Sequence, residues 1–106
     1  MRIDIATLFP EMCEAVLGAS IIGRARKNHL VEIHCHNIRD YSPDPKHHRV
    51  DDTPYGGVKG MVMQPEPIWR CYLDVVATSG SLPYVVYLSP QGKTLTQQKA
   101  LAFREI

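Results

Sequence analysis

Residues 84–88 form a continuous run of aromatic and aliphatic side chains, Tyr-Val-Val-Tyr-Leu. A strand with no polar alternation is typical of a parallel sheet covered by helices on both faces. The run is followed at once by Ser89, Pro90, Gln91 and Gly92, which have the composition of a turn. In open α/β sheets ligands bind at the carboxyl ends of the strands. The run therefore predicts a strand buried on both faces, followed by a ligand-facing turn.

The rest of the chain supplies the partners that an α/β fold needs. Residues 2–8 read as a strand, and residues 30–38 alternate between apolar and polar side chains as a half-buried strand does. Helices are predicted from Pro10 to Gly18 and from Pro65 to Gly80, because proline suits a first turn and glycine a C-cap. Thr94 to Gln97 has the spacing of a capping box, so a third helix is expected after it.

Composition limits the class of protein. The chain has 106 residues, 44% of them hydrophobic and 22% charged, which predicts one soluble globular domain. It has no apolar run long enough for a membrane span and no signal-peptide core. Cys13, Cys35 and Cys71 lack disulfide or zinc-knuckle spacing. We therefore expect a reduced, cytoplasmic protein that does not contact a membrane.

Charge is uneven although the net charge is only +1. Two short clusters are basic, and their members are Arg24, Arg26, Lys27 and His29 in the first and Lys46, His47, His48 and Arg49 in the second. Such clusters bind phosphates in nucleic-acid-binding proteins, and they also occur as ordinary solvated surface. The sequence leaves both interpretations open.

A glycine-rich stretch follows the second cluster. Asp51 and Asp52 precede Pro54, Gly56, Gly57 and Gly60, and the apolar residues 61–63 end the stretch. Glycine lets a ligand approach the main chain closely, so one interpretation is a binding loop. The other is a hairpin turn with solvated aspartates.

No motif in the sequence identifies a reaction. His34, His36, His47, His48, Asp51 and Asp52 are of the right types for a metal site, but their spacing fits no recognised metal motif. A metal-dependent hydrolase stays an alternative, and no metal is predicted. The sequence also lacks a G-x-S-x-G elbow and a GxGxxG fingerprint.

Three blocks of sequence, in order along the chain, resemble one family. Residues 1–12 end in Leu-Phe-Pro-Glu-Met, residues 50–67 read VDDTPYGGVKGMVMQPEP, and residues 87–92 read YLSPQG. The chain is identified on these blocks as a member of the TrmD family of bacterial tRNA (guanine-N1) methyltransferases. Two positions depart from the pattern, because Val58 stands where the family has a third glycine and Lys59 where it has a small residue or proline.

The resemblance implies a SPOUT-type fold, a parallel α/β sheet flanked by helices whose later part is threaded into a trefoil knot. It implies a homodimer that uses S-adenosylmethionine to methylate guanine N1 next to the anticodon of tRNA. The cofactor would contact the block after the predicted strand, which comprises Tyr87, Leu88, Ser89, Pro90, Gln91 and Gly92. The target guanine and its neighbour would lie near Asp51, Tyr55, Gly56, Gly57, Lys59 and Gly60.

By the same resemblance, the knot and the catalytic residues would follow Ile106. We therefore expect residues 1–106 to be the amino-terminal part of the methyltransferase domain and to be inactive alone, with the general base outside the chain. The alternative, from a different class, is a non-catalytic α/β module that binds RNA or a protein partner.

Overall fold

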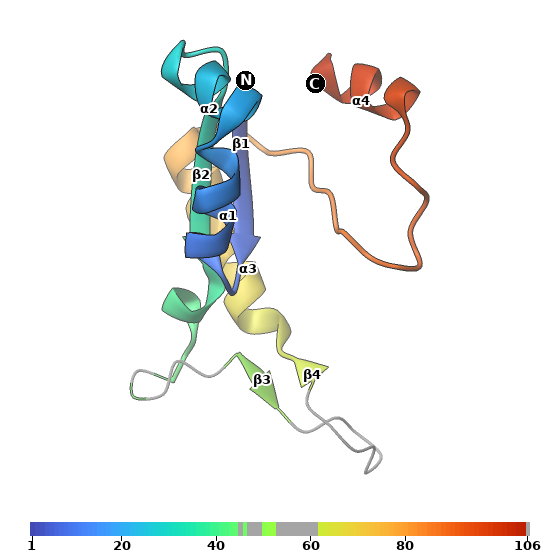
Figure 1. Cartoon of the computed structure of the whole chain (residues 1–106). Helices are drawn as coiled ribbons and strands as arrows, with labels where there is room; N and C mark the ends of the chain where they lie inside the picture. The colour runs from blue at the N-terminus through green and yellow to red at the C-terminus, as the bar shows by residue number, and fades with distance from the viewer. Residues whose placement is uncertain (45, 47–49, 53–61, 106) are drawn as a thin grey trace.

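The computed structural model describes residues 1–44, 46, 50–52 and 62–105, and the structural statements below concern those residues. The elements follow one another in the order β1 (Arg2–Thr7), α1 (Pro10–Leu17), α2 (Ser20–Lys27), β2 (Glu32–Asn37), the 3-10 helix η1 (Ile38–Tyr41), β3 (Asp51–Asp52), β4 (Val62–Met63), α3 (Pro65–Ser79) and α4 (Gln97–Arg104) (Figure 1).

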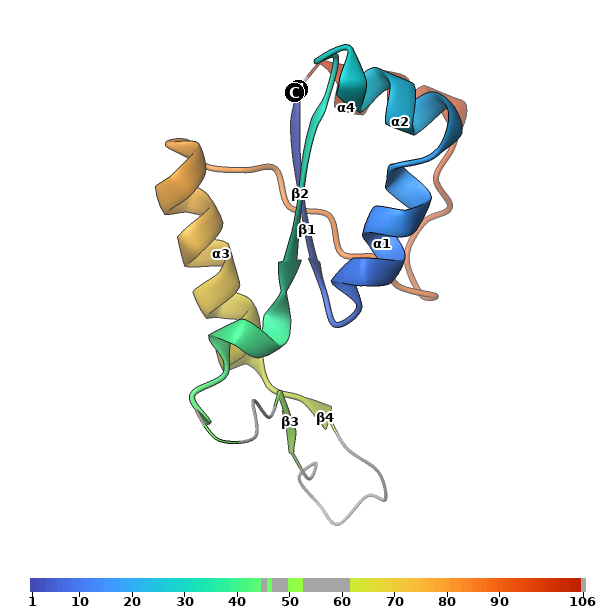
Figure 2. The same ribbon diagram turned by 60° about the vertical axis from the view of Figure 1, so that its left-hand side comes forward.

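The centre of the molecule is a parallel pair of strands. β1 and β2 run in register from Arg2 opposite Glu32 to Thr7 opposite Asn37. Helices α1 and α2 form the crossover between them, and α3 lies on the other side of the two strands (Figure 2). The predicted α/β architecture, a parallel sheet flanked by helices, is confirmed.

Helix α1 begins and ends where the sequence predicts. Pro10 occupies the first position, and the Thr7 hydroxyl accepts a hydrogen bond from the Phe9 amide (3.0 Å). Gly18 caps the other end. A side chain at Gly23 of α2 would collide with the Gly18 carbonyl group, so α2 packs against the end of α1 at a distance that only glycine permits.

Helix α3 packs against η1 and carries the main core. Pro67, Cys71 and Val75, at i, i+4 and i+8, are buried, which gives one inward stripe. Ile38 of η1 is also buried, at 6% exposed. Gly80 ends α3 in the left-handed conformation, with φ of 76°, as predicted.

The prediction of a doubly buried strand at residues 84–88 is wrong for this chain. The segment has no regular secondary structure, and its side chains are 54% to 88% exposed. A strand needs a neighbour for its backbone hydrogen bonds. In the described part of the chain, β1 and β2 pair with each other and β3 pairs with β4, so no strand is placed beside residues 84–88.

The helix predicted near the end of the sequence is present, but its cap is different. Thr96 is the N-cap of α4, and its hydroxyl accepts a hydrogen bond from the Lys99 amide at 3.2 Å. Thr94 lies two residues outside the helix, where its carbonyl accepts a bond from the Lys99 ammonium (3.0 Å). The capping-box spacing therefore identified the helix but placed its start too early.

Candidate functional site

The candidate site lies at the carboxyl end of the β1–β2 pair. The start of α1, η1, the β3–β4 ladder and the start of α3 all gather at this end (Figures 1 and 2). The bend of the segment that joins α3 to α4 lies level with the tip of β1 in both views. Ligands of open α/β sheets bind at this end. The short strands β3 and β4, which flank the glycine-rich stretch, therefore lie where such a ligand would bind.

The glycine-rich stretch is closed at its base by a short antiparallel ladder. Asp51 pairs with Met63 and Asp52 with Val62, and the Gln64 amide donates to the Val50 carbonyl at 2.6 Å. Val50 is 2% exposed, so this base is anchored in the core. The predicted tRNA-contacting residues Tyr55, Gly56, Gly57, Lys59 and Gly60, and the side chain of Asp51, lie outside the described residues.

The predicted cofactor-binding block contains a formed turn. The Gly92 amide donates to the Ser89 carbonyl (3.1 Å), and the Gln91 amide donates to the Ser89 hydroxyl (3.2 Å). Pro90 therefore stands at the second position of a hydrogen-bonded β-turn, where its fixed φ is favourable. Tyr87 and Leu88, just before the turn, are 86% and 88% exposed. The structure thus presents exposed apolar side chains followed by a hydrogen-bonded turn.

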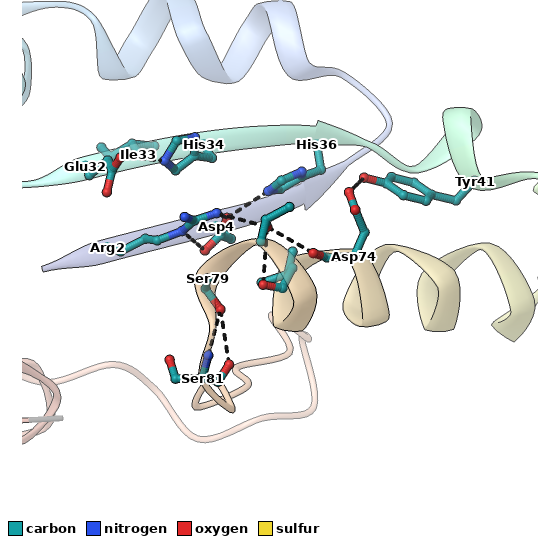
Figure 3. Close-up of polar contacts among 12 residues, drawn as sticks. Arg2, Asp4, Glu32, Ile33, His34, His36, Tyr41, Asp74, Ser79 and Ser81 are labelled. Carbon is teal, nitrogen blue, oxygen red and sulfur yellow. Dashed lines mark hydrogen bonds and ion pairs between the residues drawn. The ribbon is translucent and has the colours of Figure 1, made fainter.

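A polar cluster that the sequence analysis missed joins the sheet to α3, and we call it the Asp4 network (Figure 3). The Arg2 guanidinium donates to both oxygens of Asp4, at 3.0 Å and 3.1 Å, and Nε2 of His36 lies 2.8 Å from Asp4 Oδ1. Arg2 also donates to the Thr78 hydroxyl (3.3 Å), and that hydroxyl donates to the Asp74 carbonyl (2.9 Å).

Asp4 stays ionised because of this network. Partial burial alone would raise the pKa of its carboxyl group, but the hydrogen bonds from Arg2 and His36 outweigh it and hold that pKa below its usual value. Farther along α3, Tyr41 donates to Asp74 at 2.6 Å, and burial together with this bond raises the pKa of the Tyr41 hydroxyl.

The Asp4 network is explained by its role in holding the fold together, without any role in binding or catalysis. It ties β1 and β2 to the far end of α3, while η1 and the core hold the near end. The signal in the sequence was Arg2 and Asp4, two opposite charges at i and i+2 and hence on one face of a strand. Neither residue could be connected to Thr78 without the fold.

The two histidines of β2 do not form a shared site with each other. Their ring centroids are 6.5 Å apart. His36 is held by Asp4, whereas His34 Nε2 lies 3.1 Å from a carboxylate oxygen of Glu32. Within the described residues, no group of three or more His, Cys, Asp or Glu side chains is arranged to hold a metal ion. The alternative of a metal site that includes His47 and His48 falls outside those residues and stays a prediction.

An open pocket of about 530 Å³ lies at the opposite end of the strands. Met1, Arg2, Arg26, His29, Val31, Glu32 and Ile33 line it. It contains none of the residues predicted to bind cofactor or tRNA.

Comparison with known proteins decides the family. Residues 1–105 match the family model described as tRNA (Guanine-1)-methyltransferase TrmD. The chain belongs to the TrmD family. This confirms the assignment made from the three sequence blocks, and it makes the chain part of a methyltransferase family.

Curated TrmD proteins are similar along nearly all of this chain. The tRNA (guanine-N(1)-)-methyltransferase of Ruminiclostridium cellulolyticum is 53% identical over 100 residues, which are 94% of this chain and 42% of the relative. That of Bacillus subtilis is 45% identical over 100 residues, again 94% of this chain and 41% of the relative. The chain thus spans about two-fifths of the length of the curated relatives it matches.

A solved TrmD structure has the same arrangement of elements. It is the crystal structure of tRNA (m1G37) methyltransferase from Aquifex aeolicus, with a TM-score of 0.90 and 33% sequence identity. The match covers 100% of this chain and 47% of that chain. The fold described above is therefore the TrmD fold over the part that this chain spans, and the SPOUT-type classification is confirmed.

Proposed function

We propose that this chain is the amino-terminal part of an S-adenosylmethionine-dependent enzyme that methylates N1 of a guanine next to the anticodon of tRNA. The observation that carries the proposal is the match of residues 1–105 to the TrmD family, together with a formed turn at the residues that the resemblance assigns to the cofactor. The proposed partners are tRNA and, for the whole protein, a second copy.

The turn suits an adenosyl group. Leu88 and Pro90 offer apolar surface, and the main chain of residues 87–92 offers hydrogen-bonding groups, which is the usual make-up of a small-molecule site. The Ser89 hydroxyl and carbonyl fix the conformation of the turn before any ligand arrives, so binding would order little further backbone. S-adenosylmethionine supplies the methyl group when bound.

The glycine-rich stretch is proposed to contact the RNA. A carboxylate at Asp51 is an acceptor suited to the ring N–H or the amino group of guanine. Gly56, Gly57 and Gly60 would let the RNA approach the main chain, and Lys59 would contact a phosphate. The base of this stretch is anchored by Val50, so these contacts would be held against the core.

The general base that accepts the guanine proton is proposed to lie outside residues 1–106. We therefore expect this chain alone to bind the cofactor weakly and to show no turnover. We also propose a cytoplasmic location, where tRNA is available. Among the described helices, none is long and apolar enough to cross a membrane.

A hybrid enzyme tests this proposal. Residues 1–105 of this chain would replace the matching segment of the Bacillus subtilis relative, and the hybrid would be assayed for methyl transfer to a tRNA transcript with guanine next to the anticodon. We expect methyl transfer by the hybrid, because the two segments belong to one family and are 45% identical over 100 residues. Gln91→Ala should raise KM for S-adenosylmethionine, whereas Asp51→Ala should lower kcat with cofactor affinity unchanged.

Leu101→Ala, on α4, is the matched control and should leave both constants unchanged. A folded hybrid that binds tRNA but transfers no methyl group to it would contradict the enzyme assignment. That result would favour the non-catalytic RNA-binding module.

A further inference from the structure

A short hydrogen bond connects η1 to α3 (Figure 3). Tyr41, the last residue of η1, donates its hydroxyl proton to a carboxylate oxygen of Asp74 at 2.6 Å. A hydroxyl that bonds to a carboxylate at this distance makes a charge-assisted bond, which is stronger than one between neutral groups. The two residues are 33 positions apart in the sequence, so the bond is a tertiary contact and not part of a turn.

The Tyr41 hydroxyl reaches α3 beside its buried stripe. Cys71 and Asp74, three residues apart, are neighbours on the helix surface, and Cys71 is 1% exposed. Burial raises the pKa of the Cys71 thiol, and a hydrogen bond with the Tyr41 hydroxyl opposes this rise. The hydroxyl therefore lies between a buried thiol and a carboxylate, and it fixes the position of η1 along α3.

The 3-10 helix η1 is fixed to the carboxyl end of β2. Asn37 is both the last residue of β2 and the N-cap of η1, and its side chain accepts a hydrogen bond from the Arg39 amide at 3.0 Å. Ile38, the next residue, is 6% exposed and belongs to the core. The strand thus continues into η1 without an intervening loop, so Tyr41 has a defined place relative to the sheet.

Helix α3 is fixed in turn to the β3–β4 ladder. Gln64 alone separates β4 from Pro65, the first residue of α3, and it is the N-cap of that helix. Its amide donates to the Val50 carbonyl at 2.6 Å, and Val50 is 2% exposed. A displacement of α3 is therefore transmitted to the ladder, which closes the base of the glycine-rich stretch.

We propose that Tyr41 is a positioning residue for RNA binding, because its bond to Asp74 holds α3, and with it the β3–β4 ladder, at the carboxyl end of β2. Neither side chain contacts the RNA in this proposal. They act through the ladder, whose displacement would move the proposed RNA contacts of the glycine-rich stretch together. The inference rests on the proposed function and adds to it a pair of residues that lies outside the stretch itself.

Amide hydrogen exchange of this chain tests the positioning directly. Tyr41→Phe keeps the aromatic ring and removes only the hydroxyl. We expect the Gln64 amide to exchange about fivefold faster, the ratio that corresponds to one hydrogen bond of ordinary net strength. The change at Gln64 is taken relative to the amides of β1 and β2 in the same sample, because those amides report global stability.

Variants of Asp74 show whether the two residues act through one bond. Asp74→Asn keeps an oxygen that can accept from Tyr41, so exchange at Gln64 should stay within about twofold of wild type. Asp74→Ala should match Tyr41→Phe, and the double variant should be no worse than either single one. Glu66→Gln is the matched control, because it removes an ion pair within α3 (2.7 Å to Arg70), and it should leave exchange at Gln64 unchanged.

The hybrid enzyme described above extends the test to RNA. Tyr41→Phe and Asp74→Ala should each raise KM for the tRNA transcript about fivefold, with KM for S-adenosylmethionine unchanged. A smaller fraction of folded enzyme would instead lower kcat and leave both KM values unchanged. The two KM values therefore separate a positioning role from a purely structural one.

Each arm has a result that overturns the proposal. Wild-type exchange at Gln64 in Tyr41→Phe would show that the bond does not place the ladder. A double variant that shows the sum of the single effects would mean that the two residues act separately. A KM for tRNA that stays at the wild-type value in an active hybrid would remove the role in RNA binding. A hybrid without these changes that transfers no methyl group contradicts the proposed function instead, and the exchange arm then decides whether Tyr41 places the ladder.

Discussion

Replacing Asp4 by Asn tests whether the Asp4 network fastens α3 to the sheet. Asparagine keeps the shape of the side chain but removes the charge that receives the Arg2 guanidinium and faces His36. Hydrogen bonds to charged groups contribute about 1.5–3 kcal/mol each when they are well buried. Because Asp4 and Arg2 are 14% and 28% exposed, we discount the sum and expect a loss of about 2 kcal/mol in the free energy of unfolding.

The assay is urea denaturation followed by circular dichroism at pH 7, with a thermal scan beside it. A loss of about 2 kcal/mol should lower Tm by about 8 °C in a chain of this size. Glu66→Gln is the matched control, because Glu66 pairs with Arg70 at 2.7 Å but both side chains are about half exposed. That change should cost no more than about 0.5 kcal/mol.

The contribution of Asp4 to the free energy of unfolding should decrease in acid, because its pKa is lowered in the folded state. The folded-state pKa of Asp4 is below the unfolded value of 3.8, so its contribution is complete above that value. It is lost as the pH falls through the lower folded pKa. The gap between wild type and Asp4→Asn should therefore be constant above about pH 5 and should close in stronger acid. An Asp4→Asn cost equal to that of Glu66→Gln, or a gap that stays constant below pH 3.8, would refute the reasoning.

Three further changes probe other parts of the fold. Ile33→Ala should cost about 2–3 kcal/mol in urea denaturation, because Ile33 is 9% exposed, and a cost under about 1 kcal/mol would show that the sheet face is not packed. Gly23→Ala should cost about 1–3 kcal/mol by pushing α2 away from Gly18, and a stabilised variant would contradict that close approach. Thr96→Ala should destabilise α4 locally by about 1 kcal/mol in amide hydrogen exchange, while Thr94→Ala leaves its exchange unchanged; the reverse order would move the cap to Thr94.

Local signals in the sequence were sufficient for α1 and α3 and for β1 and β2. Helix α1 begins at Pro10 and is capped by Gly18, and α3 begins at Pro65 and is capped by Gly80. Such start and stop signals act within one turn of a helix, so they can be interpreted without tertiary information. The alternation of residues 30–38 likewise reports burial that one neighbouring strand and one helix provide.

The prediction of a strand at residues 84–88 is wrong because a strand depends on neighbours that local sequence does not report. Their composition describes the environment of a central strand, but a strand forms only where neighbouring strands satisfy its amides. In the described structure these residues have no such neighbour, and their side chains stay exposed. The apolar composition of residues 84–88 suits a buried central strand, but the segment can form that strand only where neighbouring strands are present.

In the candidate site, too, the feature set by local sequence was predicted and the feature set by tertiary packing was missed. The turn at Ser89 to Gly92 was predicted because proline and glycine define a turn locally. The Asp4 network was missed because Arg2 and Thr78 are far apart in the sequence and are brought together by the packing of α3 on the strands. Whether residues 87–92 bind the cofactor stays a prediction, since a pocket requires more than one wall.

The most direct test of the account is a nuclear magnetic resonance titration of this chain with S-adenosylmethionine. We expect saturable shifts confined to the amides of residues 87–89, 91 and 92, with a dissociation constant on the order of 1 mM, because one wall supplies only part of a pocket. Pro90→Asp should abolish these shifts and leave the spectrum of α3 unchanged. Saturable shifts in the 530 Å³ pocket at the other end of the strands, or no shifts at all in the folded chain, would contradict the assignment of this turn to the cofactor.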